Sequence, residues 1–397
     1  MSTKRIIILL SLTVLAVSAI LAAGCGSSSS GTKEPIKIGV VLSESGANQP
    51  LGAPEKKAIQ LFTKQINDSG GIDGHQIEVV YKDDGSDPSK AQQAAVELIE
   101  QENVVALIGS SGTGTTLSMK QEATKSQIPQ VCLAAGANIM DGDATWIFRT
   151  PPTATQAGNK VLDYIQNTMG LTKIALLYDT NAFGTDGKAV VEGQAGGYGL
   201  QVVASEGYQT DESEEGMDTH LTNIRTSNPD LVLVWGTNPG PAKIAKRMKD
   251  KGMTQPFLGS HGIANQAFIN LAGDAANGVV FPAGKMLVYQ QALDPSSAEY
   301  KAIDSFETEY KAEYGDQVVD TFAGHGWDAM LIITDALKRA GATATPVQLR
   351  DAIETTTGLV GIDGVFNYSA SDHNGLRPDD LIMVKIVNGQ WEPATQA

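Results

Sequence analysis

The stretch Ile36-Lys37-Ile38-Gly39-Val40-Val41-Leu42 decides the fold class. It is short and almost continuously apolar, which is typical of a strand that is buried on both faces of a sheet. Residues 54–67 follow with apolar side chains at helical spacing, and residues 77–81 form a second apolar run. The order strand, helix, strand predicts parallel strands joined by a helix.

The same alternation continues along the chain. Asp87-Pro88 supplies a cap and a first-turn proline for a helix at 89–102, before a strand at 104–108, a helix at 115–126 and a strand at 131–133. After Arg149-Thr150-Pro151-Pro152 the pattern restarts. The predicted strands are at 174–178, 202–206 and Leu231–Trp235, with a late strand at Leu381–Val387. The predicted helices are at 154–169, 184–195, 217–227, 241–251, 296–314 and 322–340. Two doubly wound α/β lobes are therefore expected, with a ligand cleft between them.

The charge of the chain excludes one class of partner. The 397 residues carry a formal net charge of −16. Residues 1–24 contain Lys4 and Arg5 and no acid, so the rest of the chain has 27 basic and 45 acidic residues, or −18. So acidic a chain argues against nucleic-acid binding, which relies on clustered Lys and Arg that face the phosphates. We expect a soluble monomer that binds no nucleic acid.

The first 24 residues are typical of a secretory signal peptide. A basic start, residues 1–5, precedes the apolar segment 6–23. Leu21-Ala22-Ala23-Gly24-Cys25 resembles the lipobox of bacterial lipoproteins, although Ala22 stands where that motif usually has Leu. The resemblance implies cleavage before Cys25 and lipidation of its thiol, with residues 25–34 as a flexible tether. The alternative is a retained membrane-spanning helix.

Motifs of common enzymes are missing from the sequence. It has no Gly-x-x-x-x-Gly-Lys loop, no Gly-x-Ser-x-Gly elbow and no His-Glu-x-x-His helix, and its five histidines do not pair at metal-ligand spacing. We therefore expect no cofactor, no metal and no enzymatic activity. An esterase or amidase is the enzymatic alternative, with Ser111 or Thr113 and His261 as nucleophile and base. Cys132 lies in the apolar run 128–133 and is expected in the core.

Several motifs, in order along the chain, resemble the leucine/isoleucine/valine-type periplasmic binding proteins. They are 36–46, Asn67-Asp68-Ser69-Gly70-Gly71-Ile72-Asp73-Gly74, Tyr81-Lys82-Asp83-Asp84, 105–109, Asn181-Ala182-Phe183-Gly184 and Gly324-His325-Gly326-Trp327-Asp328-Ala329. The resemblance runs from about residue 36 to 391. It implies a type I periplasmic-binding-protein fold, with two doubly wound parallel-sheet lobes joined by three crossings.

The resemblance also implies a domain division and a role. Lobe 1 is expected to comprise 35–150 and 284–362, and lobe 2 to comprise 151–283 and 363–393. The crossings are expected near 149–152, 281–284 and 361–363. The expected role is that of an extracytoplasmic, lipid-anchored subunit that delivers a small molecule to the membrane permease of an ABC importer. A sensing subunit of a signalling receptor on the same fold is the alternative.

The loop 110–114 is the predicted carboxylate-binding loop of lobe 1. It follows a strand and opens a helix, so free backbone N–H groups and the positive end of the helix dipole should face the cleft. Ser111, Gly112 and Thr113 are its candidate ligand-binding residues, and the Thr113 hydroxyl adds a donor. A second loop, with Ala134 and Gly136, also leaves a strand end and could donate backbone groups.

Departures from the resembled family bear on the ligand. In its amino-acid-binding members, an acidic residue of lobe 2 holds the α-amino group, and His261 takes that place here. Gly136 stands where the family has a Thr. Thr237 and Leu51 each stand where the family has an aromatic residue. Burying an ammonium without an anion costs several kcal/mol. The expected ligand is therefore a carboxylate without an α-amino group, to which His261 would donate a hydrogen bond or add a positive pole.

Two aromatic residues complete the candidate site. Phe183 occupies the position of a family aromatic that closes on the ligand, and Phe322, with His325, is expected at the edge of the pocket.

Overall fold

The computed structural model describes residues 33–315 and 318–394. The predictions for the signal peptide, Cys25 and most of the tether fall outside these residues. All described helices and strands belong to one compact unit, Pro35–Ala397. None of the helices described in it combines the length and apolarity that crossing a membrane requires.

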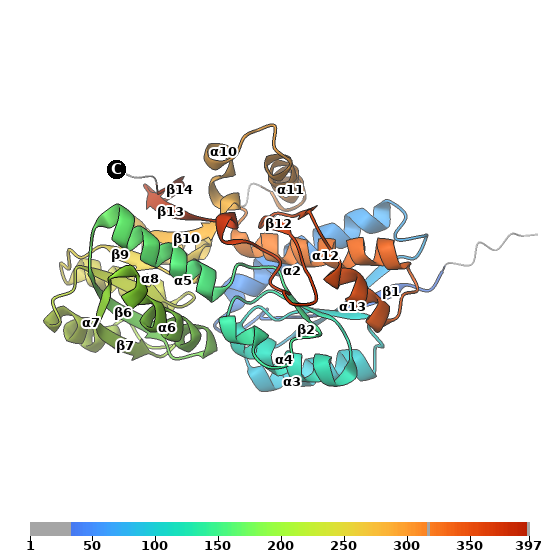
Figure 1. The fold of residues 1–397 in the computed structure, drawn as a ribbon, viewed down its shortest axis with the longest axis horizontal. Helices are drawn as coiled ribbons and strands as arrows, with labels where there is room; N and C mark the ends of the chain where they lie inside the picture. Colours follow the sequence, from blue (N-terminus) through green and yellow to red (C-terminus); the bar gives the residue numbers. More distant parts are fainter. Residues whose placement is uncertain (1–32, 316–317, 395–397) are drawn as a thin grey trace, which may run out of the picture. The chain divides into compact units, whose positions relative to one another are not determined.

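The first sheet consists of five parallel strands in the order β2-β1-β3-β4-β5. Its strands are β1 (Ile36–Leu42), β2 (Ile77–Asp83), β3 (Ala106–Gly109), β4 (Gln130–Cys132) and β5 (Ile147–Arg149). One face packs on α2 (Gln49–Asp68), α12 (Thr321–Ala340) and α13 (Pro346–Glu354). The other face packs on α3 (Pro88–Glu100) and α4 (Thr113–Ser126). Figure 1 shows these two helical layers, and the lobe is doubly wound as predicted.

The second sheet has seven strands in the order β14-β13-β10-β9-β8-β6-β7. They are β6 (Lys173–Asp179), β7 (Gln201–Tyr208), β8 (Leu231–Trp235), β9 (Phe257–Gly259), β10 (Val280–Gly284), β13 (Leu381–Val387) and β14 (Gln390–Pro393). The five strands from β7 to β10 are parallel, whereas β13 and β14 pair antiparallel at one edge. The parallel sheet expected for this lobe is therefore correct except at that edge.

Helices cover both faces of the second sheet. Separate apolar clusters lie on its two faces. The helices are α5 (Ala154–Asp163), which continues as a π-helix over Tyr164–Met169, α6 (Ala182–Gln194), α7 (Met217–Thr226), α8 (Gly240–Asp250) and α9 (Gln266–Ala272). Between the last two crossings, α10 (Tyr289–Ala292) and α11 (Ala298–Tyr314) join a further cluster with α2 and α12.

The second and third crossings lie later in the chain than expected. Residues 281–284 belong to the buried strand β10, so the chain leaves the second sheet after Gly284. Phe366, Tyr368 and Leu376 pack in the core of the first sheet. The third crossing therefore lies between Leu376 and Leu381, and the boundary expected after residue 362 is corrected. The sequence around 366–376 has no regular periodicity that would have assigned these core residues to a lobe.

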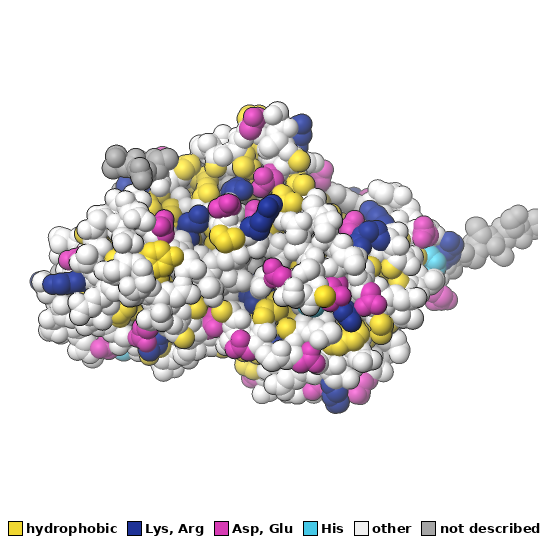
Figure 2. Space-filling model, viewed as in Figure 1, with side chains coloured by type: hydrophobic (Ala, Val, Ile, Leu, Met, Phe, Trp, Pro, Cys, Tyr) yellow, Lys and Arg dark blue, Asp and Glu magenta, His cyan; other side chains and the backbone are white. Residues whose placement is uncertain are grey.

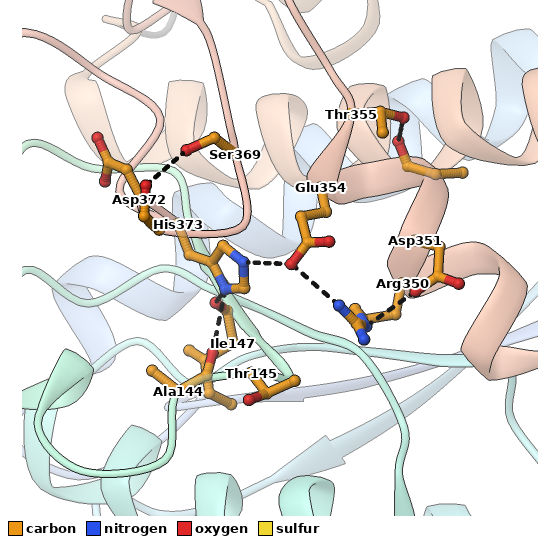
Figure 3. A network of polar contacts seen from close by, with 12 residues as sticks. Ala144, Thr145, Ile147, Arg350, Asp351, Glu354, Thr355, Ser369, Asp372 and His373 are labelled. Carbon is orange, nitrogen blue, oxygen red and sulfur yellow. Dashed lines mark hydrogen bonds and ion pairs between the residues drawn. The ribbon is translucent and has the colours of Figure 1, made fainter.

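A polar network fixes the segment before the third crossing to β5 (Figure 3). The His373 Nδ1 lies 3.0 Å from the Ala144 carbonyl oxygen and 2.9 Å from that of Ile147, and its Nε2 lies 3.2 Å from Glu354 Oε1. The ring of His373 also stacks on Phe148 at 4.2 Å. Because β5 leads directly into the first crossing, the contacts of His373 join the chain segments that precede the first and the third crossing.

Candidate functional site

A cavity of about 280 Å³ lies between the two lobes, at the carboxyl ends of strands from both sheets. Such a position is the usual ligand site of open α/β sheets. The residues that line it are Asn48, Leu51, Ser86, Pro88, Ser111, Gly112, Thr113, Gly114, Thr115, Leu133, Ala134, Ala135, Pro151, Pro152, Asn181, Ala182, Phe183, Thr237, His261, Gly262, Ala264, Ala283, Gly284, Thr321, Phe322, His325 and Leu381.

The structure brings most of the predicted site residues to this cavity. Those that line it are Ser111, Gly112, Thr113, Ala134, Phe183, Thr237, His261 and Phe322, together with Leu51 and His325. Gly136 is the exception. Its carbonyl oxygen accepts a hydrogen bond of 2.8 Å from Arg149 Nη2, and a Cβ atom at Gly136 would lie only 2.4 Å from Thr113 Cγ2. Gly136 therefore packs behind Thr113 and acts on the cavity indirectly.

Loop 110–114 of lobe 1, the predicted carboxylate-binding loop, presents unpaired donors to the cavity. Gly112 caps α4 through its backbone alone, and its carbonyl accepts from the Thr116 N–H at 2.9 Å. The N–H groups of the first helical turn have no acceptor within the helix. Thr113 Oγ1 is buried and has no hydrogen-bond partner among the described residues. An anion at this loop would satisfy these donors.

Ser111 contributes to the loop in a different way. Its hydroxyl donates to the Glu55 carboxyl group and accepts a 3.1 Å hydrogen bond from the Ser43 N–H. The hydroxyl is therefore engaged beneath the loop, and only the backbone of Ser111 is left for a ligand. The same contacts bear on the esterase alternative, because the Ser111 hydroxyl pairs with Glu55 and not with His261.

Two buried carboxyl groups lie beneath this loop, yet neither lines the cavity. Burial raises the pKa of Glu55 well above its usual range, although the Ser111 hydroxyl acts in the opposite direction. Burial likewise raises the pKa of Asp84, which accepts from the hydroxyls of Ser43 and Ser110. These acids hold the loop in place and present no anion to a ligand.

In the described part of the chain, the side chains that line the cavity include no Asp, Glu, Lys or Arg. The fully buried Arg149 lies behind the second loop, where Nη1 donates to the Ala134 carbonyl at 3.2 Å and Nη2 to that of Gly136. Its guanidinium thus binds carbonyl oxygens in place of a carboxylate. Burial lowers the pKa of Arg149, while the nearby carboxylate of Asp186 raises it, so this cation is already partly compensated within the fold.

His261 lies on the lobe 2 side of the cavity within an aromatic cluster. Its ring centroid is 5.4 Å from that of Phe183 and 5.9 Å from that of Trp235, both edge-on. Burial, reinforced by the charges of His325 and Arg149, lowers the pKa of His261 to about 3. The imidazole is therefore neutral near pH 7, which supports the predicted hydrogen-bond donor and argues against a positive pole. Both ring nitrogens are buried without a partner among the described residues.

His325 is held in a fixed orientation at the opposite side of the cavity. Its Nδ1 lies 2.6 Å from Asp363 Oδ2, which leaves Nε2 as the ring nitrogen available to a ligand. Asp363 is in turn fixed by its own N–H, which donates to Asp328 Oδ2 at 2.9 Å. Nothing in the spacing of these residues along the sequence indicated this pairing.

Sequence reasoning missed Asn48 and Thr321 among the polar residues of the cavity. Asn48, from lobe 1, meets the predicted Thr237 of lobe 2, and their side chains lie 3.4 Å apart. Thr321, the first residue of α12, lines the cavity with a buried hydroxyl that has no partner among the described residues. Its position directly after the capping residue Asp320 was the one available signal, because first-turn residues of a helix often face a ligand.

The remaining candidate groups lie apart from this site. Cys132 is fully buried in β4, as predicted, and burial raises the pKa of its thiol. Across residues 33–315 and 318–394, no group of three His, Cys, Asp or Glu side chains is arranged to hold a metal ion. On the face shown in Figure 2, Lys and Arg are interspersed with Asp and Glu and do not form a basic patch.

The arrangement of two lobes around one cavity agrees with the comparison to known proteins. A family model described as periplasmic binding protein matches residues 35–390. The chain belongs to the periplasmic binding protein family. Its fold is the type I fold of that family, and several of its relatives are named as Leu/Ile/Val-binding proteins or their homologues. Membership indicates an extracytoplasmic location.

Three relatives illustrate the similarity. Amino acid binding protein of Pseudomonas aeruginosa is 24% identical over 60% of this chain and 63% of that protein, which is less than two thirds of its length. Leu/Ile/Val-binding protein of Escherichia coli K12 is 26% identical over 69% of this chain and 78% of that protein. An extracellular ligand-binding receptor of Rhodopseudomonas palustris HaA2 superimposes with a TM-score of 0.83 at 26% identity, covering 90% of this chain and 99% of the receptor.

Proposed function

We propose that the chain is the ligand-binding subunit of an ABC importer. It is a monomer anchored to the outer face of the cell membrane by a lipid on Cys25, and it delivers its ligand to a membrane permease. Family membership and the cavity between two lobes support this role. The lobes close over the ligand, and the closed form docks on the permease.

The ligand is a small carboxylate without an α-amino group. The observation that carries this proposal is that no acidic side chain among the described residues lines the cavity, whereas His261, at the place that the resemblance assigns to the acid, does line it. The Escherichia coli relative is named for leucine, isoleucine and valine. An amino acid entering the present cavity would bury its ammonium group without an anion, which costs several kcal/mol.

The cavity offers each part of such a ligand a suitable partner. Its carboxylate accepts hydrogen bonds from the first-turn N–H groups of α4 and from the Thr113 hydroxyl, and its hydrocarbon part packs on Leu51, Phe183 and Phe322. The neutral His261 donates one further hydrogen bond from lobe 2.

Matched pairs of compounds test this proposal. Leucine would be compared with 4-methyl-2-oxopentanoate, and phenylalanine with 3-phenylpropanoate, first by thermal shift and then by calorimetry. A ligand at 100 times its dissociation constant stabilises the protein by about 2.7 kcal/mol, which a thermal shift detects easily. We expect binding by an acid that lacks the amino group and none by its amino-acid counterpart. Micromolar binding of leucine would refute the proposed ligand class.

A further inference from the structure

One carboxylate outside the cavity connects the two lobes. Asp186 lies on α6 of lobe 2, and its Oδ2 accepts a 2.7 Å hydrogen bond from the Ala137 N–H. Its Oδ1 accepts a 3.1 Å hydrogen bond from the Asn138 N–H. Both donors follow β4 of lobe 1, and the next residue, Ile139, is buried in the core of that lobe. Both oxygens of Asp186 are thus bound to the backbone of the opposite lobe.

The segment that Asp186 binds, loop 134–138, is also held from its other side. Arg149 donates to the carbonyl groups of Ala134 and Gly136. The loop therefore uses its carbonyl groups toward Arg149 and its N–H groups toward Asp186. The positive guanidinium of Arg149 binds the carbonyl ends of these peptide groups, and the negative carboxylate of Asp186 binds N–H groups of the same loop. The loop is therefore held by opposite charges from two sides.

Loop 134–138 links Asp186 to the ligand site. Ala134 and Ala135 line the cavity, and Gly136 packs so closely on Thr113 that a Cβ atom would come within 2.4 Å of Thr113 Cγ2. Asp186 itself does not line the cavity. A movement of this loop would reach both the cavity and the Thr113 hydroxyl, because packed side chains transmit displacement.

We propose that Asp186 is a positioning residue that latches lobe 2 to loop 134–138 and so favours the closed arrangement of the lobes through backbone contacts, independently of the ligand. The latch is the contact of the Asp186 carboxylate with the N–H groups of Ala137 and Asn138. Its effect on ligand affinity rests on the proposed function, whereas the latch itself does not.

The contact has the moderate strength that a reversible closure needs. Burial raises the pKa of Asp186, while the two N–H groups and the charge of Arg149 act in the opposite direction and Asp141 adds to the rise. Burying the charge therefore offsets much of what the hydrogen bonds contribute. If Asp186 is removed, the two N–H groups are left without acceptors in the closed arrangement, whereas water satisfies them in the open one.

Amide hydrogen exchange on the full-length protein without ligand tests the latch. In Asp186→Asn, one amide oxygen replaces two carboxylate oxygens, and in Asp186→Ala both acceptors are lost. We expect protection of the Ala137 and Asn138 N–H groups to fall at least about tenfold in Asp186→Ala and less in Asp186→Asn. Glu192→Gln is the matched control, because it removes the same charge from the same helix at a contact with Lys188. It should leave both amides protected.

Two results would overturn the latch. One is wild-type exchange of both amides at the rate of an unprotected chain, and the other is unchanged protection in both Asp186 variants. Amides of β1 report whether each variant is folded, and if Asp186→Ala is not, Asp186→Asn supplies the test. Calorimetry with 4-methyl-2-oxopentanoate separates the two proposals. Absence of wild-type binding to any tested acid counts against the proposed function, and the exchange result still decides the latch.

Discussion

Ser111 and Thr113 lie two residues apart in one loop, yet their hydroxyl groups have opposite uses. Ser111 joins Glu55 to the Ser43 backbone beneath the loop, whereas Thr113 Oγ1 has no partner in the described part of the chain. The sequence predicts both as ligand-binding residues. It could not separate them, because the difference depends on Glu55, which reaches the loop from a helix more than 50 positions earlier.

Substitution of the two residues should therefore separate stability from binding. Ser111→Ala leaves the Glu55 carboxyl group and the Ser43 N–H without their partner, so the free energy of unfolding should fall by about 1–3 kcal/mol. Thr113→Val removes an unpaired hydroxyl at nearly constant volume, so stability should change by less than about 0.5 kcal/mol while ligand affinity falls about tenfold. Denaturant unfolding and calorimetry measure the two effects. A large loss of stability in Thr113→Val would contradict this assignment.

The buried neutral His261 should make stability depend on pH. Its pKa is about 3 in the folded protein and about 6.5 in an unfolded chain. Between these values the unfolded chain binds the additional proton, so wild-type stability should fall as the pH drops from about 6.5 toward 3. The variant His261→Gln should lack this component. Urea unfolding of both proteins across that range checks the difference, and parallel curves would show that His261 is charged or exposed.

At the scale of single elements, the N-cap residue of α12 is a second titrating group, and its effect on stability has the opposite dependence on pH. Asp320 caps this helix by accepting from the N–H groups of Phe322 and Ala323, and burial raises its pKa to about 7. In an unfolded chain the value is about 3.9. The folded protein therefore holds an extra proton between about pH 4 and 7, and this contribution to stability is lost as the pH rises through that window.

Asp320→Asn isolates this contribution, because asparagine also caps helices but does not titrate. We expect the stability of the wild type relative to Asp320→Asn to decline from about pH 4 to pH 7. Unfolding of both proteins by denaturant in a series of buffers measures it. A constant difference would mean that Asp320 remains ionised throughout.

The elements that could be predicted are those with long apolar runs. β1, β8 and β13 begin and end at the predicted residues. Helix α2 was predicted from residue 54 but begins at Gln49, because Pro50 and not Pro54 is the proline near its start. The three-residue strands β5 and β9 were missed, since so few residues show no periodicity.

The candidate site was predictable where it depends on the ends of strands and helices. Gly112 and Thr113 follow from the rule that parallel strands end at one edge of a sheet, whereas Thr237 was predicted from the resemblance to the family. The indirect position of Gly136 and the pairing of His325 with Asp363 were not predictable, because each depends on a residue brought close only by the folded chain.

For the molecule as a whole, the important feature is that the first and third crossings are joined at Arg149. Its N–H donates to the His373 carbonyl at 3.0 Å, and its carbonyl accepts from the Tyr368 hydroxyl at 2.7 Å. The same residue holds loop 134–138 by its side chain. Arg149 therefore connects the hinge region with the ligand site, so bending at the crossings and the position of the loop should be coupled.

Closure of the lobes should be visible in solution. Shifting the open and closed populations from 1:99 to 99:1 requires about 5.5 kcal/mol of differential affinity, which a few charge-assisted hydrogen bonds supply. Small-angle scattering with and without a carboxylate that raises the melting temperature should show a smaller radius of gyration in the bound state. An unchanged radius at saturation would contradict closure on the ligand.

Trp235 has a practical consequence of its own. The indole is fully buried, 6.0 Å from Phe183 and 5.9 Å from His261 by ring centroid, and both of these neighbours line the cavity. Its emission depends on the polarity and protonation of groups at that distance. The protein thus contains an intrinsic fluorophore directly behind its ligand site, so that candidate compounds can be ranked by tryptophan fluorescence without a label.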